Sequence, residues 1–346
     1  MPKKTQKTQD FNDYIIEKFG EQVLEGHKKE ITAVTTGCTS LDTSIGVGGI
    51  PKGMITVIYG PEGSGKTTMA LNTAKGVANS GKKVLYIEVE NLLNGSIIKA
   101  VLGDDTQVDN ILILSPKSGE DAFMMAEAGI ASGDFELVVV DSIGAMVSKK
   151  EMEVPFDKDT VGQLPRMVGR FIKRNMYNIR TQDIAVLILN QVRDNVGSYV
   201  KSFSMPGGHQ LQHEAAVVIS LTKGEKLTKG NDVVGIVTKF VVKKNKLAPP
   251  FRSFTVPILF GQGIDFYSDL IDFAKLLGVL TSSGPYYKFQ EVSLGKGKGE
   301  ARERLMSDKE LLDNIVETVY NTVNKETNIA DLLNDLEEEI SEELEY

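Results

Sequence analysis

The stretch MITVIYGPEGSGKTT (residues 54–68) joins an apolar run to a glycine-rich turn that ends in a lysine and two threonines. The turn matches the pattern G-x-x-x-x-G-K-[ST] through Gly60, Gly65, Lys66 and Thr67. Glycines let backbone N–H groups curl around phosphate, and a helix after the turn adds its positive N-terminus. We therefore expect an ATP site in which Lys66 reaches the outer phosphates and the Thr67 hydroxyl binds Mg²⁺. The other ATP-binding residues expected in the turn are Pro61, Glu62, Gly63, Ser64 and Thr68.

Four more apolar runs follow, and segments of helical character separate them. The runs are continuous rather than alternating, which is typical of parallel strands covered by helices on both faces. The sequence thus predicts an α/β fold, with a mostly parallel twisted sheet flanked by helices. The runs are KVLYIEVE (83–90), NILILSP (110–116), FELVVVD (135–141) and IAVLILN (184–190).

The flanking parts of the chain differ from this central pattern. A short amphipathic helix is expected over residues 11–19, where it packs on its own body or on a neighbouring subunit. After residue 190 the apolar segments look antiparallel, and from about residue 268 helices return around a β-like piece. We expect four parts, namely an N-terminal helix and strand (1–35), an ATPase core (36–267), a small α/β lobe (268–328) and an acidic tail (329–346).

Composition narrows the class of protein. The net charge of −8 comes from the last sixteen residues, which hold eight acids and no bases; without them 39 acids balance 39 bases. The tail is either a solubilising segment or a mobile competitor for a cationic surface. Cys38 is the only cysteine, which excludes an internal disulfide and a thiolate zinc site. Because we see no secretory signal and no apolar stretch of about 18 residues, we expect a cytoplasmic protein.

Polar side chains stand at the ends of the predicted strands. Asp141 is placed to hold Mg²⁺ through water, with a capping aspartate as the alternative. Hydrolysis also needs a group that orients or deprotonates water. Because parallel strand ends open onto one crevice, Glu90 is the best-placed base. Gln191, at the same rim, is either a sensor of the terminal phosphate or an ordinary strand-end amide. We therefore assign catalysis to Glu90, Lys66 and Gln191.

Two long loops, over about 148–162 and 192–209, follow two of these strand ends. Loops of this length in a compact domain are usually functional. The second loop combines three glycines with bases and aromatic residues, a mixture suited to DNA phosphates and bases. Its candidate contacts are Arg193 and Lys201 for phosphates, and Tyr199 and Phe203 for bases.

The segment QLPRMVGRFIKRNMYNIRTQ (163–182) lies between the two loops and is expected to be a helix. Arg166, Arg170, Lys173 and Arg174 fall at i, i+4, i+7 and i+8, which is one helical face. A solvated basic face is the alternative. Two loops and a basic stripe on one side of a nucleotide-binding core favour DNA as the ligand.

Taken together, these segments resemble the RecA family of DNA strand-exchange recombinases of bacterial type. The similarity covers nearly the whole chain, and SIGAMVSKKE (142–151) also resembles the phage-encoded members. After a lead-in at 35–60, the matching segments are GPEGSGKTT (60–68), VVVDS (138–142), LNQVR (189–193), MPGGH (205–209), VVKKNKLAPPF (241–251) and PILFGQGIDFYSDLIDF (257–273).

The resemblance implies a helical filament on single-stranded DNA that pairs with homologous duplex and exchanges strands in recombination, repair and the SOS response. Glu90 matches the catalytic glutamate, Gln191 the residue that couples the terminal phosphate to the second DNA loop, and Lys244 and Lys246 the lysines that reach the neighbouring subunit's ATP. The N-terminal part docks on the next subunit, and the lobe gathers duplex DNA. Single-strand-binding and mediator proteins are implied partners, and no membrane is. The implied DNA contacts are Arg166, Lys173, Arg193, Gly207, Gly208 and His209.

The sequence also departs from the family pattern. Asn94 and Ile97 stand where the family uses Asp and Tyr against adenine, whereas Phe260 keeps an aromatic ring, so Asn94 and Phe260 are the expected base contacts. Asn91 replaces a histidine beside Glu90. Two alternatives remain, a hexameric helicase motor on the same core fold and a non-catalytic ATP-binding mediator. The short N-terminal part and the lobe argue against the helicase, and Glu90 with Gln191 argues against the mediator.

Overall fold

The computed structural model describes two compact units, which comprise residues 1–32 and residues 33–346. In the first unit, residue 14 and residues 16–18 are helical, and Lys18 Nζ donates to Tyr14 Oη over 3.0 Å. The rest of the helix expected over 11–19, like the acidic tail, lies outside the described residues. These residues are 14, 16–18, 30–93, 95–103, 106–155, 162–194, 203–204 and 206–325.

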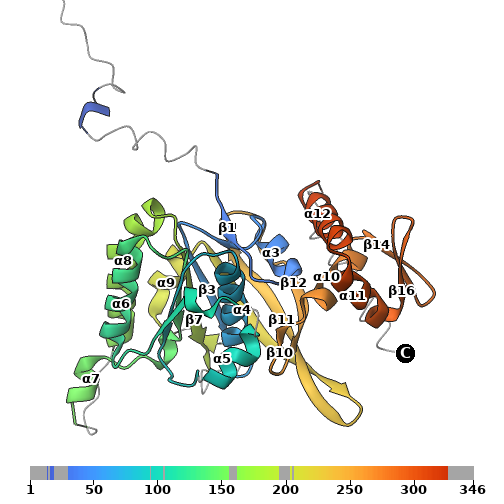
Figure 1. Ribbon diagram of the computed structural model, residues 1–346. Coiled ribbons are helices and arrows are strands. Elements are labelled where there is room, and N and C mark those ends of the chain that lie inside the picture. The colour runs from blue at the N-terminus through green and yellow to red at the C-terminus, as the bar shows by residue number, and fades with distance from the viewer. Residues whose placement is uncertain are drawn as a thin grey trace, which may run out of the picture. The chain divides into compact units, whose positions relative to one another are not determined.

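A sheet of nine strands forms the centre of the second unit (Figure 1). Its order is β13-β12-β11-β10-β3-β7-β6-β4-β5. The pairs from β10 to β5 are parallel, and those from β10 to β13 are antiparallel. The predicted fold class is therefore confirmed. The strands are β3 Ile55–Gly60, β4 Val84–Glu88, β5 Ile111–Leu114, β6 Leu137–Asp141, β7 Ala185–Gln191, β10 Val217–Lys229, β11 Asp232–Asn245, β12 Ser253–Leu259 and β13 Gly263–Ile264.

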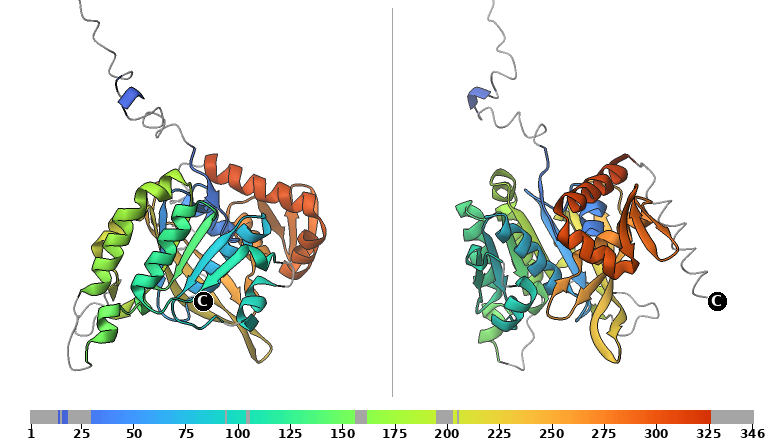
Figure 2. Two further views of the ribbon diagram at one scale, coloured as in Figure 1. Left: turned by 60° about the vertical axis from the view of Figure 1, so that its left-hand side comes forward. Right: turned by 45° about the vertical axis from the view of Figure 1, so that its right-hand side comes forward.

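The inner parallel strands are mostly apolar because both faces of the sheet are covered there. Along β6, Val138 and Val140 enter one hydrophobic cluster, whereas Leu137 and Val139 enter the other. Helices α6 (Gly119–Ser132) and α8 (Gln163–Thr181) cover the first face, where Phe123 and Phe171 stack at 4.8 Å. Helices α3 (Thr39–Ile45) and α4 (Lys66–Asn79) contribute to the other cluster. Figure 2 shows the sheet and its flanking helices in two further views.

Short elements connect this framework and carry the predicted loops. The paired strands β1 and β2 precede β3, and the paired strands β8 and β9 belong to the second loop. These elements are β1 Ala33–Val34, β2 Ile50–Pro51, α5 Gly95–Leu102, η1 Val108–Asn110, η2 Ile143–Ala145, α7 Lys149–Glu153, β8 Arg193–Asp194, β9 Phe203–Ser204 and α9 Gly208–Glu214. Among the described residues, no helix is both long and apolar enough to cross a membrane.

The C-terminal lobe packs three helices around a three-stranded antiparallel sheet (Figures 1 and 2). The basic stretch GKGKGEARER (295–304) forms most of helix α11. Ala301 and Leu305, four residues apart, bury one face of that helix and explain why it forms despite its glycines. The elements are α10 Phe266–Leu276, β14 Leu280–Ser283, β15 Tyr286–Phe289, β16 Val292–Lys296, α11 Gly297–Ser307 and α12 Lys309–Lys325.

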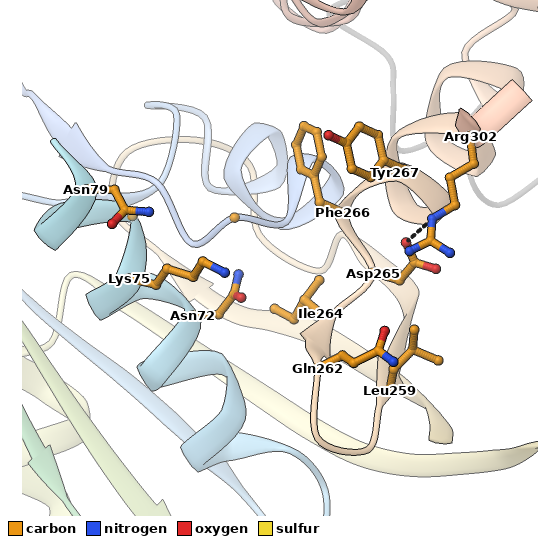
Figure 3. A pocket seen from close by; sticks show the side chains of 12 residues that line it. Asn72, Lys75, Asn79, Leu259, Gln262, Ile264, Asp265, Phe266, Tyr267 and Arg302 are labelled. Atoms are coloured by element: carbon orange, nitrogen blue, oxygen red, sulfur yellow. Dashed lines mark ion pairs between the residues drawn. The ribbon is translucent and has the colours of Figure 1, made fainter. Parts of the chain in front are cut away.

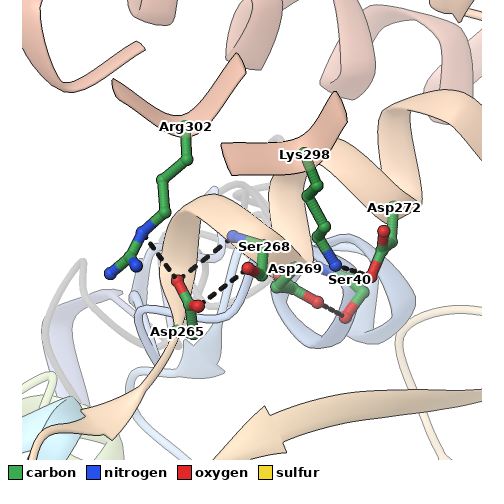
Figure 4. Close-up of polar contacts among 7 residues, drawn as sticks. All are labelled: Ser40, Asp265, Ser268, Asp269, Asp272, Lys298 and Arg302. Atoms are coloured by element: carbon green, nitrogen blue, oxygen red, sulfur yellow. Dashed lines mark hydrogen bonds and ion pairs between the residues drawn. The ribbon is translucent and has the colours of Figure 1, made fainter. Parts of the chain in front are cut away.

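A buried carboxylate, that of Asp269, joins the lobe to the core (Figure 4). Asp269 of α10 accepts hydrogen bonds from the Ser40 backbone N–H over 3.1 Å and from the Ser40 hydroxyl over 2.5 Å. Burial raises the pKa of Asp269 to about 6, although its bonds to Ser40 act in the opposite direction. Nearby in α3, burial raises the pKa of Asp42 to about 7, against hydrogen bonds from Thr35 and Thr36. Ionised carboxylates therefore cost free energy at this junction.

The raised pKa of Asp269 predicts that the free energy of unfolding decreases as pH rises. A raised folded-state pKa means that the contribution of Asp269 is fully present below its unfolded pKa of about 3.9 and is lost as pH rises through about 6. Substituting Asp269→Asn should reduce the loss of unfolding free energy between pH 5 and pH 8 by about 1 kcal/mol. Urea unfolding at both pH values measures this difference.

Asp272→Asn is the matched control, since Asp272 lies on the same helix, is 58% exposed and pairs with Lys298 at 2.5 Å. This variant should keep the pH dependence of the unsubstituted protein. An unchanged pH dependence in Asp269→Asn would show that the buried carboxyl does not titrate between the two states.

Candidate active site

The glycine-rich turn lies between β3 and α4, as the sequence predicts. Gly65 has φ 89°, and a Cβ on it would meet Ile258 Cδ1 at 2.3 Å, so only glycine fits. Lys66 is 8% exposed, and its ammonium donates to the carbonyl oxygens of Gly60 at 3.0 Å and Pro61 at 2.8 Å. Burial lowers the pKa of Lys66 while Asp141 and Glu90 raise it. The lysine is thus held inside the turn, where its charge is poorly solvated.

Thr67 and Asp141, the two residues expected to bind Mg²⁺, are hydrogen-bonded to each other. Thr67 Oγ1 donates to Asp141 Oδ2 over 2.9 Å, and Tyr86 Oη donates to the same oxygen over 2.7 Å. Burial raises the pKa of Asp141, whereas the bonds from Tyr86 and Thr67 lower it. A hydroxyl and a carboxylate are the hard oxygen ligands that Mg²⁺ takes beside substrate phosphates. Within the described ranges no group of three or more His, Cys, Asp or Glu could hold a metal.

Glu90 and Gln191 come together although 101 positions separate them in the chain. Gln191 Nε2 donates to Glu90 Oε1 over 2.6 Å, and the Ser142 hydroxyl donates to the same oxygen over 2.8 Å. Glu88, in contrast, is 4% exposed and accepts from the Leu92 backbone N–H. Glu90 is therefore the less buried of the two carboxylates and the one joined to a neighbouring strand end.

Phe260, one of the two expected adenine contacts, lies in a turn beside α5. Phe260 is 56% exposed, and Ile97 on α5 is 42% exposed. A Cβ placed on Gly261 would lie 4.0 Å from the Ala100 Cβ, so α5 and this turn are neighbours. Asn94 lies outside the described residues. The Phe260 ring and the Ile97 side chain thus expose apolar surface on two neighbouring segments.

A separate cavity of about 410 Å³ lies further along α4 (Figure 3). Asn72, Lys75 and Asn79 line it from the middle and the end of that helix, and Phe266 and Arg302 line it from the lobe side. Arg302 Nε lies 3.6 Å from Asp265 Oδ1. The cavity does not include Lys66 or Thr67, so it is distinct from the phosphate loop.

The basic residues of α8 are exposed along one face, opposite its buried Phe171 and Ile172. Arg166, Arg170 and Lys173 follow the predicted stripe, whereas Arg174 donates through Nη2 to Glu127 over 2.6 Å. That ion pair leaves the other three as the better candidates for phosphate.

The second loop is described only at its two ends. Arg193 and Phe203 lie in the paired strands β8 and β9, but nothing is described of their side chains, and Tyr199 and Lys201 lie outside the described residues. At the loop's far end, Gly207 and Gly208 have φ 93° and 77°, and His209 is exposed on α9. Asn190 Nδ2 donates to the Pro206 carbonyl oxygen over 2.7 Å. This bond ties the start of the loop to its end.

Lys244 lies near the end of β11 and Lys246 just after it, and both are beside α9. Lys244 Nζ donates to the carbonyl oxygens of Gln212 and His213, each over 2.7 Å, and Lys246 Nζ donates to that of Glu214 over 3.3 Å. Burial lowers the pKa of Lys244, and repulsion from the charge of Lys246 lowers it further. Two cations therefore bind the negative end of α9, the helix that follows the second loop.

Three polar residues of this site were not predicted. Tyr86 sits within an apolar run and reads as a core residue, so its hydroxyl bond to Asp141 leaves no mark in the sequence. Asn190 and Ser142 each adjoin a predicted site residue, Gln191 and Asp141, and that adjacency is the only available signal. Both are almost fully buried, at 0% and 1% exposure.

Comparisons with known proteins agree over nearly the whole chain. The RecA N-terminal domain matches residues 5–265, and the RecA C-terminal domain matches residues 268–324. Protein RecA of Bacillus licheniformis is 35% identical over 332 residues, which cover 96% of this chain and 93% of that protein. Protein RecA of Bacillus pumilus (strain SAFR-032) gives the same values. Protein RecA of Bacillus subtilis (strain 168) is 34% identical over 317 residues, 91% of this chain and 90% of its own. The chain belongs to the RecA family of ATP-dependent DNA strand-exchange recombinases, which are DNA-dependent ATPases.

Proposed function

We propose that Glu90 is the general base for ATP hydrolysis and that Gln191 reports the state of the terminal phosphate to the second DNA loop. The contact between Glu90 Oε1 and Gln191 Nε2 at 2.6 Å carries this proposal. It joins the residue that activates water to the residue that precedes the loop. Lys66 neutralises the outer phosphates, and Thr67 with Asp141 holds Mg²⁺, which supplies charge neutralisation of the β- and γ-phosphates.

In this arrangement Gln191 has two alternative partners. It donates to Glu90 in the described structure, and a terminal phosphate offers it a more highly charged acceptor. Moving the amide toward phosphate releases one donor from Glu90 and displaces the start of β8. Through this one side chain, ATP binding thereby changes both the hydrogen bonding of Glu90 and the position of the start of the second loop.

The DNA site consists of α8 and the two loops. Arg166 and Lys173 are exposed on the outer face of α8, and Gly207, Gly208 and His209 begin α9 at the end of the second loop. Backbone N–H groups at such glycines approach phosphates closely because no Cβ intervenes. Arg193, Tyr199 and Phe203 complete the proposed contacts to single-stranded and duplex DNA.

Filament assembly needs a surface that accepts the next subunit. Strand β5 ends the order of the nine-stranded sheet, so one of its edges is unpaired among the described strands. Leu112 in this strand is 48% exposed, and Val108 just before it is also 48% exposed. An apolar strand edge is a template for another chain. We assign it to the N-terminal part of the neighbouring subunit, and we assign Lys244 and Lys246 to that neighbour's ATP.

Electron microscopy with single-stranded DNA, Mg²⁺ and a non-hydrolysable ATP analogue tests this assembly. We expect helical filaments, and we expect Leu112→Lys to reduce their number about tenfold because a charge at an apolar contact weakens docking by 1–3 kcal/mol, roughly. Val292→Lys, which places the same charge on an exposed strand of the lobe, is the control. Closed rings in place of filaments would support a hexameric motor instead.

The cellular setting follows from this activity. We place the protein in the cytoplasm, in recombination, DNA repair and the SOS response, with single-strand-binding and mediator proteins as partners. A strand-exchange reaction between a circular single strand and its homologous linear duplex, with ATP and Mg²⁺, measures the whole function. Joint molecules are the expected product, and their absence would leave only the ATPase.

A further inference from the structure

The residue after Asp141 contacts the proposed base, and no role described so far uses it. Ser142 is 1% exposed, and its hydroxyl donates to Glu90 Oε1 over 2.8 Å. Gln191 donates to that same oxygen. One oxygen of the carboxylate therefore has two donors, and among the described residues no hydrogen bond is formed by the other oxygen, Oε2.

This asymmetry decides which oxygen takes a proton. A carboxylate oxygen that already accepts two hydrogen bonds is a weaker acceptor than its free partner. Fixing Oε1 thus leaves Oε2 to accept the proton of the attacking water. It also prevents rotation of the carboxylate, which would otherwise present either oxygen.

The two donors to Glu90 are not equivalent. Gln191 stands at the rim of the crevice, is half-buried and has an alternative partner in the terminal phosphate. Ser142 is buried at the end of β6 and is held by the backbone around it, since its carbonyl accepts from the Ala145 N–H and the Val89 N–H donates to the Asp141 carbonyl over 2.7 Å. Only Ser142 keeps its contact when Gln191 moves.

We propose that Ser142 is a positioning residue that holds the carboxylate of Glu90 in register with the metal-binding side chain of Asp141 throughout the ATPase cycle. The proposal rests on the proposed role of Glu90 as general base. Asp141 and Ser142 are consecutive, and β4 pairs with β6 up to Glu88 opposite Asp141. The Ser142–Glu90 contact extends this pairing by one side-chain bond, so the metal ligand and the base share one rigid support.

The test is the variant Ser142→Ala, assayed as ATPase in the presence of single-stranded DNA. We expect kcat to fall about 10- to 100-fold, the range for a misplaced base, while KM for ATP and ATP-dependent DNA binding change less than about twofold. Ser142→Thr, which retains the hydroxyl, should recover most of kcat. Ser132→Ala removes a hydroxyl bonded to Gly129 on α6 and should leave kcat unchanged.

A double substitution separates this role from a structural one. In the Glu90→Gln background, Ser142→Ala should change the single-turnover rate less than about twofold, because Ser142 acts through Glu90. The same 10- to 100-fold loss in that background would overturn the proposal, as would a normal kcat for Ser142→Ala alone. A lower unfolding midpoint, with kcat and DNA binding reduced together, would assign Ser142 to folding.

The failure of this inference can be told from the failure of the proposed function. If Glu90→Gln keeps normal turnover, the base itself is wrongly assigned. If Glu90→Gln abolishes turnover while Ser142→Ala behaves as the unsubstituted protein, only the positioning role is wrong.

Discussion

Substituting Glu90→Gln should lower ATP turnover about 100-fold or more while ATP-dependent binding of single-stranded DNA remains. Glutamine has the shape of glutamate, and its carbonyl oxygen accepts from Ser142 and Gln191 as the carboxylate oxygen does. It cannot accept a proton from water, and that is the contribution of a general base. Turnover is measured by phosphate release, and DNA binding by fluorescence anisotropy with ATP and Mg²⁺.

Glu88→Gln provides the control for this experiment. Glu88 lies two residues earlier on the same strand but is 4% exposed and bonds the Leu92 backbone, so it should affect turnover far less. Loss of both turnover and DNA binding in Glu90→Gln would mean that Glu90 supports nucleotide binding and that the base lies elsewhere.

The double variant Lys244→Ala/Lys246→Ala should also lose at least about 100-fold in turnover, because cations supplied by a neighbour stabilise the charge of phosphoryl transfer. The reason differs from that for Glu90, since we propose that these lysines serve the active site of the adjacent subunit. ATP affinity of the dilute, unassembled protein should change less than about twofold. Lys243→Ala is the matched control, because Lys243 is exposed on the opposite face of β11.

Mixing the two inactive proteins gives a sharper test of the shared site. A subunit lacking both lysines still has Glu90, and a subunit with Glu90→Gln still has both lysines. A complete site forms wherever a Glu90→Gln subunit supplies its lysines to the ATP site of a subunit that lacks both lysines. In a random 1:1 filament about one interface in four is complete, since the contact is head-to-tail. Turnover should therefore rise to about a quarter of normal. No recovery on mixing would show that the lysines act within their own subunit.

Much of the fold was predictable because the inner strands of the parallel region are buried on both faces, the edge strand β5 being the exception. The stretch LVVV (137–140) within FELVVVD is continuously apolar for that reason. The sequence gives little indication of helix α11, since its glycines and lysines interrupt the apolar pattern. Its buried residues are Ala301 and Leu305. Local composition decides a strand of this kind, whereas tertiary contacts decide that helix.

The sequence could suggest site residues that follow the ends of strands, but not those that lie within strands. Glu90, Asp141 and Gln191 converge because parallel strands open onto one crevice, which is a property of the fold class. The bond from Tyr86 to Asp141 depends on which way one strand residue faces, and the bond from Ser142 to Glu90 depends on two strand ends being level. Strand order and register are needed for both, and the sequence does not specify them.

The bond from Asn190 to the Pro206 carbonyl has a consequence for how this protein can change over evolutionary time. It closes the second loop at its base, next to Gln191 and independently of the residues between the two ends. Lengthening a loop whose ends are already held costs little, about 0.6 kcal/mol for each doubling. We therefore expect the ATPase to tolerate insertions between the two tied ends, so the segment that we propose for DNA contact can diversify while the proposed nucleotide sensor stays constant.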